Sequence, residues 1–135
     1  MKVFSKQQRR RGFTLIELMI VITIILILVS ISIPIYTNSV MHAKEAVLRD
    51  DLFTLRSCID QYTLDKQKAP QALDDLVQAG YLKMIPKDPI TGAADTWQVT
   101  TDDTLMDPNQ TQPGITDVHS GANGVSSDGT PYNSW

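Results

Sequence analysis

The sequence predicts an α+β protein: a long N-terminal α-helix, membrane-spanning in its first half, packs under a small antiparallel β-sheet with a loop-rich C-terminus. Three observations indicate this fold. An apolar run occupies residues 13–33, an amphipathic pattern of helical period continues to about residue 64, and short β-prone runs separated by turn residues follow. A chain of 135 residues has room for one modest domain beside such an anchor.

The first element is predicted to be a membrane helix. From Phe13 to Ile33 there are 21 residues with a single charge, at Glu17. At about 1.5 Å per residue this run covers roughly 31 Å, which matches a hydrocarbon core of about 30 Å. Five basic residues and no acidic residue precede it, so residues 1–12 are expected in the cytoplasm and the rest of the chain outside.

Glu17 is the unusual residue of this helix. A carboxylate there costs about 2.5 to 3.5 kcal/mol to insert, so its presence needs a physical reason. One interpretation keeps Glu17 hydrated at the membrane edge, beside the arginines at 9–11. The other gives it a positively charged partner inside the membrane.

The string Arg-Gly-Phe-Thr-Leu-Ile-Glu-Leu at 11–18 closely resembles the class III leader of type IV pilins and type II secretion pseudopilins. The resemblance implies that a membrane-embedded prepilin peptidase cuts after Gly12 and that the new amine of Phe13 is N-methylated. It also implies that Glu17 meets the amine of a neighbouring subunit in a filament, where the two charges attract strongly. A twin-arginine secretory signal fits less well, because its apolar region should be shorter and lack Glu.

The helix is expected to continue from about Phe13 to about Leu64, a length of roughly 78 Å at 1.5 Å per residue. Pro34 should bend or loosen it without ending it. Beyond Pro34, apolar residues recur at spacings of mainly three and four, with charged residues largely between them. The expected buried stripe consists of Tyr36, Val40, Ala43, Val47, Leu48, Leu52, Leu55, Ile59 and Tyr62. Cys58 is expected to be a small core residue.

The remainder is expected to form a small globular head. A second helix is predicted at 71–79, with Gly80 as its C-terminal cap. The best strands are 97–101 and 115–118, and three or four short strands fit in all. So small a sheet is not stable alone and must cover one face of the long helix. The proline-punctuated pattern over 62–89 is similar to that of major pseudopilins. It narrows the resemblance from pilins in general to this group.

The C-terminal loop at 117–135 is rich in oxygen and glycine, a composition that suits a hard cation or a plain glycine-rich turn. EF-hand spacing is absent. The resemblance implies calcium, because major pseudopilins bind it in a C-terminal segment of this kind. The matching positions are Ser120, Asn123 in place of the family's aspartate, and Asp128, with Asp117 as a further carboxylate.

Charge and motif content exclude other classes. Removing the five basic residues before Phe13 from the 12 in the chain leaves seven against 15 acidic residues, a net charge of about −8. Nucleic acid is therefore not an expected partner. No catalytic triad, phosphate loop or zinc spacing is present, so an enzyme is not predicted. The single cysteine, Cys58, excludes an internal disulfide.

The resemblance thus implies a structural subunit of a type II secretion pseudopilus, which polymerises with other pseudopilins and drives protein export across the outer membrane. The expected parts are a leader at 1–12, a transmembrane and filament-core helix at 13–34, its amphipathic continuation at 35–64 and the head at 65–135. The implied partners are the prepilin peptidase, the inner-membrane assembly platform and its ATPase, and the implied location is the bacterial inner membrane with the head in the periplasm. The alternatives are a type IV pilin of a surface fibre and a membrane-anchored binding domain that never polymerises.

Overall fold

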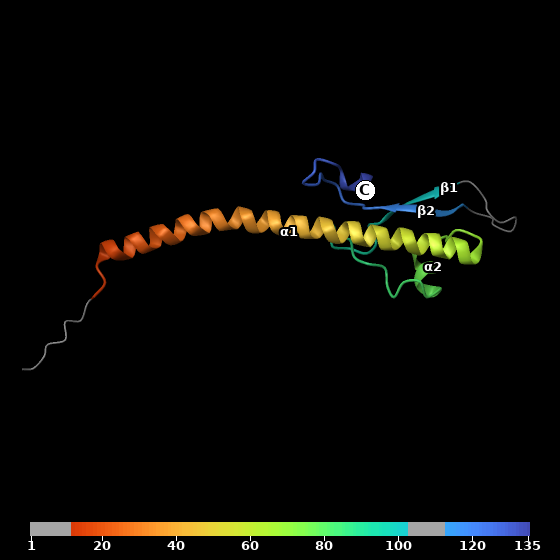
Figure 1. The fold of residues 1–135 in the computed structure, drawn as a ribbon, viewed down its shortest axis with the longest axis horizontal. Coiled ribbons are helices and arrows are strands. Elements are labelled where there is room, and N and C mark those ends of the chain that lie inside the picture. The colour runs from red at the N-terminus through yellow and green to blue at the C-terminus, as the bar shows by residue number, and fades with distance from the viewer. Residues whose placement is uncertain (1–11, 103–112) are drawn as a thin grey trace, which may run out of the picture. The chain divides into compact units, whose positions relative to one another are not determined.

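The computed structural model describes residues 12–102 and 113–135, which divide into two compact units, one up to Asn38 and one from Ser39 to Trp135 (Figure 1). Helix α1 (Leu15–Lys66) runs through both units. The second unit adds α2 (Leu73–Gln78), β1 (Gln98–Asp102), β2 (Gly114–His119) and the short 3-10 helix η1 (Tyr132–Ser134). The predicted α+β class is confirmed. The predicted leader, apart from Gly12, lies outside the described residues.

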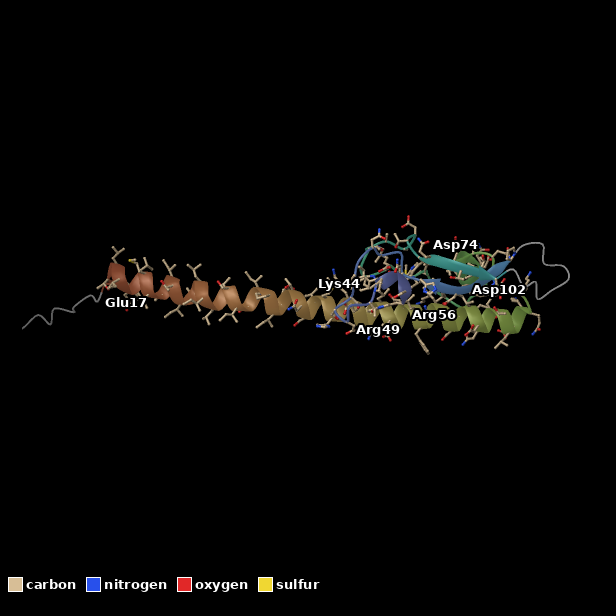
Figure 2. The ribbon with its side chains drawn as sticks, turned by 90° about the horizontal axis from the view of Figure 1, so that it is seen from above. Glu17, Lys44, Arg49, Arg56, Asp74 and Asp102 are labelled. Carbon is tan, nitrogen blue, oxygen red and sulfur yellow. The ribbon has the colours of Figure 1, made fainter. Side chains whose placement is uncertain are left out.

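The first unit is a helix with its apolar side chains unpacked. Every residue from 12 to 39 is exposed, and Phe13 is 83 % exposed. Figure 2 shows Glu17 near the start of this helix, with the side chains that follow it projecting outward. The hydroxyl groups of Thr23, Ser30 and Ser32 each donate to the carbonyl four residues earlier, at 2.7 to 2.8 Å, so the helix satisfies them internally. Within the described ranges, one helix, α1, is long and apolar enough to cross a membrane. The helix continues through Pro34, as predicted.

One face of α1 carries the core of the second unit. The buried residues of the helix are Glu45, Leu48, Leu52, Leu55, Cys58, Ile59 and Tyr62. The predicted stripe is confirmed from Leu48 to Tyr62, and Cys58 is buried as expected. The stripe is wrong at Tyr36, Ala43 and Val47, which are exposed, Tyr36 by 71 % and Val47 by 49 %, and Val40 is only half-buried. Tyr36 belongs to the first unit, and Val47 lies one residue, or about 100° of helical rotation, away from Leu48.

The sheet consists of two antiparallel strands. Gln98 pairs with His119 and Asp102 pairs with Gly114, with a bulge between Thr100 and Thr101. All of β1 is exposed, whereas β2 buries Ile115 and Val118 in the core. In the part of the chain that the structure describes there are two strands and one isolated bridge, fewer than the three or four strands expected. Much of the C-terminal segment is held by side-chain hydrogen bonds instead of strand pairing.

Helix α2 is shorter than the predicted 71–79 but ends as expected. Gly80 has a φ of +86°, the left-handed conformation that favours glycine. The amide of Tyr81 donates to the carbonyl of Leu76 at 2.9 Å, and that of Gly80 donates to Val77 at 3.2 Å. This pair of hydrogen bonds is the Schellman motif, which satisfies carbonyls that the helix end would leave unpaired.

Asp88 fixes the loop that follows α2 to the end of β2. Its side chain is fully buried, and it accepts hydrogen bonds from the amide of Ile90 at 2.8 Å and from the hydroxyl of Ser120 at 2.5 Å. Because a buried carboxylate needs such partners, these contacts determine the conformation of the loop. They also occupy the hydroxyl of Ser120, one of the predicted calcium ligands.

Candidate functional site

The N-terminal motif also begins the helix. Gly12, Phe13 and Thr14 precede α1, and the amide of Glu17 donates to the hydroxyl oxygen of Thr14 at 3.3 Å. Thr14 is therefore the N-cap, and Thr-x-x-Glu is the pattern of a capping box. A carboxylate in the first turn also interacts favourably with the helix dipole. Gly12, Phe13 and Glu17 are all exposed in the structure.

This capping role was not predicted, although the Thr14-x-x-Glu17 spacing could have indicated it. Its consequence is local: the helix has its own start signal immediately after Phe13. The cap satisfies one of the amides that the start of a helix leaves without an intrahelical partner.

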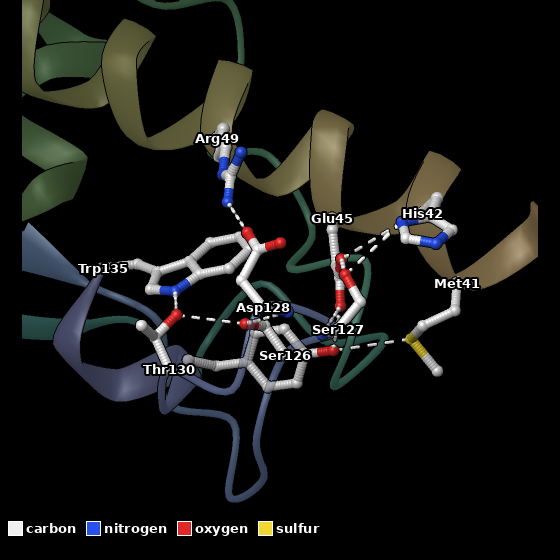
Figure 3. A network of polar contacts seen from close by, with 10 residues as sticks. Met41, His42, Glu45, Arg49, Ser126, Ser127, Asp128, Thr130 and Trp135 are labelled. Atoms are coloured by element: carbon white, nitrogen blue, oxygen red, sulfur yellow. Dashed lines mark hydrogen bonds and ion pairs between the residues drawn. The ribbon is translucent and has the colours of Figure 1, made fainter. Parts of the chain in front are cut away.

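The second polar site joins α1 to the C-terminal segment through Glu45 (Figure 3). Only 4 % of Glu45 is exposed. Its carboxylate accepts from the amide and hydroxyl of Ser127, at 2.8 and 2.5 Å, and from the hydroxyl of Tyr132 at 2.8 Å. The imidazole of His42 lies 3.8 Å away. These three donors satisfy the buried carboxylate.

Arg56 is a second contact between α1 and this segment. Its guanidinium group donates to the carboxylate of Asp117 at 2.7 Å and to the main-chain oxygens of Val118 and Trp135 at 2.9 and 2.7 Å. The Nδ1 atom of His119 also lies 2.6 Å from the Trp135 oxygen. One arginine thereby joins the end of β2 to the last residue.

Arg49 forms the third contact. Its guanidinium lies 2.7 Å from the carboxylate of Asp128 and 4.4 Å above the ring of Trp135. Both members of the Arg49–Asp128 ion pair are 60 % exposed, so the pair by itself contributes little, about 0–1 kcal/mol. The cation–π contact and the hydrogen bond from the Trp135 indole to Thr130, at 2.8 Å, place the aromatic ring against the helix.

The predicted calcium residues are not brought together as ligands. Asp117 is held by Arg56, Asp128 by Arg49 and Ser120 by Asp88, while Asn123 is exposed. Within residues 12–102 and 113–135, no group of three or more His, Cys, Asp or Glu side chains could hold a metal ion. As placed, these residues do not fit a calcium site, because the side chains of Asp117, Asp128 and Ser120 engage three different partners.

Local contacts lower the pKa values of two carboxyl groups at the contacts between α1 and the C-terminal segment, Glu45 and Asp117. Hydrogen bonding from the Ser127 side chain outweighs burial and lowers the pKa of Glu45 below its ordinary value. Burial would raise the pKa of Asp117, but the amide of Val118 and the guanidinium of Arg56 hold this pKa below its ordinary value. Both side chains are therefore carboxylates at neutral pH.

Acid should weaken the head through Glu45. Since its folded pKa is depressed, its contribution to stability is fully present above the unfolded value of about 4.3 and is lost as the pH falls through the folded pKa. Thermal melts followed by circular dichroism from pH 7 down to pH 3 should show this loss. The melting temperature of Glu45→Gln should depend less steeply on pH below about 4.3. An equally steep dependence in the variant would assign the acid sensitivity to other groups.

These features define a class of protein: an apolar N-terminal helix suited to membrane anchoring, preceded by a basic segment and followed by a small α+β head. Residues 7–33 match the prokaryotic N-terminal methylation motif. The chain is 32 % identical over 98 residues to type II secretion system core protein G of Klebsiella pneumoniae, a match that covers 61 % of this chain and 70 % of the relative. No solved structure is matched.

Relatives from other bacteria carry the same name. The chain is 34 % identical to type II secretion system core protein G of Escherichia coli K12 over 97 residues, covering 60 % of this chain and 67 % of the relative. It is 32 % identical to that of Vibrio cholerae over 100 residues, covering 63 % and 68 %. The chain belongs to the type II secretion system core protein G family, the major pseudopilins. These are structural proteins and not enzymes.

Proposed function

We propose that this chain polymerises through its N-terminal helix into a periplasmic pseudopilus that drives protein export across the outer membrane. The observation that carries the proposal is the first unit, an exposed apolar helix with a single carboxylate at Glu17. Such a surface is stable in a lipid bilayer or against other copies of the same helix, and not in water. A filament of packed helices supplies the second environment.

Assembly begins with processing. The prepilin peptidase removes residues 1–12 by cutting after Gly12, and the amine of Phe13 is methylated. Residues 13–34 then form the transmembrane and filament-core helix, 35–64 its amphipathic continuation and 65–135 the head with its loop at 117–135. The match of residues 7–33 to the methylation motif supports processing in this region and the apolar helix that follows it.

Within the filament, the carboxylate of Glu17 pairs with the N-terminal amine of a neighbouring subunit. Each charge removes the desolvation penalty of the other, so the pair also sets the axial position of one helix against the next. Subunits are drawn from the inner membrane by the assembly platform and its ATPase, which act on the cytoplasmic side. The relatives favour this machinery over a type IV pilus, because each of those named above is a core protein G.

The mature N-terminus tests the proposal. Intact mass and fragmentation of the membrane-associated protein should give a chain that begins with N-methyl-Phe13. Substitution of Gly12 by Val should leave the leader attached, whereas Ser5→Ala, a change within the leader and away from the cut, should be processed normally. A wild-type chain that retains Met1 would contradict the proposal and favour a simple membrane anchor.

Calcium binding by the C-terminal loop remains a prediction from the resemblance. Asp117, Asp128 and Ser120 would have to leave their present partners, which are Arg56, Arg49 and Asp88, before their oxygens could converge on one ion with Asn123.

A further inference from the structure

The three charged side chains that contact the C-terminal segment lie on one face of α1. Glu45, Arg49 and Arg56 are separated by four and seven residues, which at 100° per residue places them within about 40° of each other around the helix. A helix face of this kind presents its charges as a row along the axis. We call these three residues the charged row.

Each member of the charged row contacts a different part of the segment. Arg56 holds the end of β2 at Asp117 and Val118. Glu45 holds Ser127 and Tyr132, and Arg49 holds Asp128 and the ring of Trp135. Contacts at the beginning, middle and end of a glycine-rich segment restrict its conformations as a bound ion or a disulfide would.

These contacts compete with a cation for the same oxygens. Calcium needs about six to eight oxygens at 2.3 to 2.6 Å. The Oδ1 atom of Asp117 already accepts from both Arg56 and the amide of Val118, each at 2.7 Å, and Asp128 accepts from Arg49 at 2.7 Å. A divalent ion at either carboxylate would stand beside a guanidinium group of like charge.

We propose that the charged row takes the place of a bound cation in this chain, and that the head folds and stays folded without calcium. The proposal concerns the head alone and does not depend on filament assembly. The proposal accounts for the asparagine at position 123, where the resemblance implies an aspartate. Because the charged row already restricts the segment, no carboxylate is needed at this position.

The test uses the full chain, purified in dodecyl maltoside, with thermal unfolding followed by near-ultraviolet circular dichroism. The melting temperature of the wild-type chain should be the same in millimolar calcium chloride and in excess EGTA. Arg56→Gln should lower it by several degrees in both solutions, since about 1 kcal/mol corresponds to about 4–8 °C for a domain of this size. Lys44→Gln, which removes an exposed charge one residue before Glu45, should leave it unchanged.

A double-mutant cycle between Arg56 and Asp117 measures the interaction of one member of the charged row with the C-terminal segment. Arg56→Gln and Asp117→Asn should be less than additive, by the same amount with calcium and with EGTA. If Arg56→Gln does not fold, Arg56→Lys keeps the charge but loses the forked geometry and should show a smaller decrease. A wild-type melting temperature that rises with calcium, or calorimetric calcium binding that Asp117→Asn abolishes, would overturn the proposal. So would an Arg56→Gln chain as stable as the wild type.

Discussion

Replacing Glu45 by alanine is expected to lower the melting temperature of the head by roughly 8–30 °C. The substitution removes a buried carboxylate and leaves the amide of Ser127 and the hydroxyl of Tyr132 without their acceptor. Hydrogen bonds to a charged group contribute about 1.5–3 kcal/mol, and donors left unsatisfied add to the loss. The free energy of unfolding should therefore fall by about 2–4 kcal/mol. At about 4–8 °C per kcal/mol this gives the expected decrease.

Graded variants separate this network from a general loss of charge on α1. Tyr132→Phe removes one hydroxyl and should cost about 1 kcal/mol, a smaller decrease than Glu45→Ala. Asp60→Ala, at an exposed position of the same helix, should melt like the wild type. Circular dichroism melts at neutral pH measure all three. Equal melting temperatures for Glu45→Ala and Asp60→Ala would show that the Glu45 contacts do not stabilise the head.

Glu17→Ala is expected to reduce filament yield more than a hundredfold while leaving membrane insertion intact. Removing one partner of a buried ion pair costs about 3–5 kcal/mol, because the other charge stays buried and unpaired. Every 1.4 kcal/mol is a factor of ten in an association constant, so the loss at each subunit contact exceeds a hundredfold. Periplasmic filaments, released by opening the outer membrane, pelleted and quantified by immunoblotting, measure the effect. Insertion should improve, since the carboxylate no longer enters the bilayer.

Two further variants test whether filament assembly depends on the charge of Glu17. Glu17→Gln keeps the shape of the side chain and removes its charge, and it should assemble as poorly as Glu17→Ala. Ser30→Ala removes a polar group that already bonds to the carbonyl of Leu26, so it should assemble normally. A filament yield from Glu17→Ala equal to that of the wild type would contradict the proposed pairing of Glu17 with the amine. An absence of filaments from the wild-type chain would favour the anchored domain that does not polymerise.

The sequence predicted the elements whose signals are local. The apolar run at 13–33 and the periodic stripe from Leu48 to Tyr62 indicated one helix to about Leu64, and the structure ends it at Lys66. Gly80 was identified as a cap because a positive φ favours glycine. Such features depend on neighbours within one or two helical turns, which the sequence displays directly.

The polar site was not predicted, because its partners are far apart in the chain. Glu45 bonds to Ser127 across 82 positions, and Arg56 bonds to Asp117 across 61. Charged residues were assigned to solvent, yet Glu45 lies three residues before Leu48, in register with the buried stripe. A charge in that register is the signal that could have indicated a buried partner. The identity of the partner, however, required the fold.

The buried cysteine makes the chain a convenient subject for chemical labelling. Cys58 is the single thiol of the sequence, and its burial raises its pKa, so little reactive thiolate forms near neutral pH. Its sulfur lies 3.6 Å from the carbonyl of Tyr81, within the core. A maleimide probe or crosslinker should therefore react first with a cysteine introduced at an exposed position. Neighbouring copies in an assembled fibre can then be mapped without first removing the native thiol.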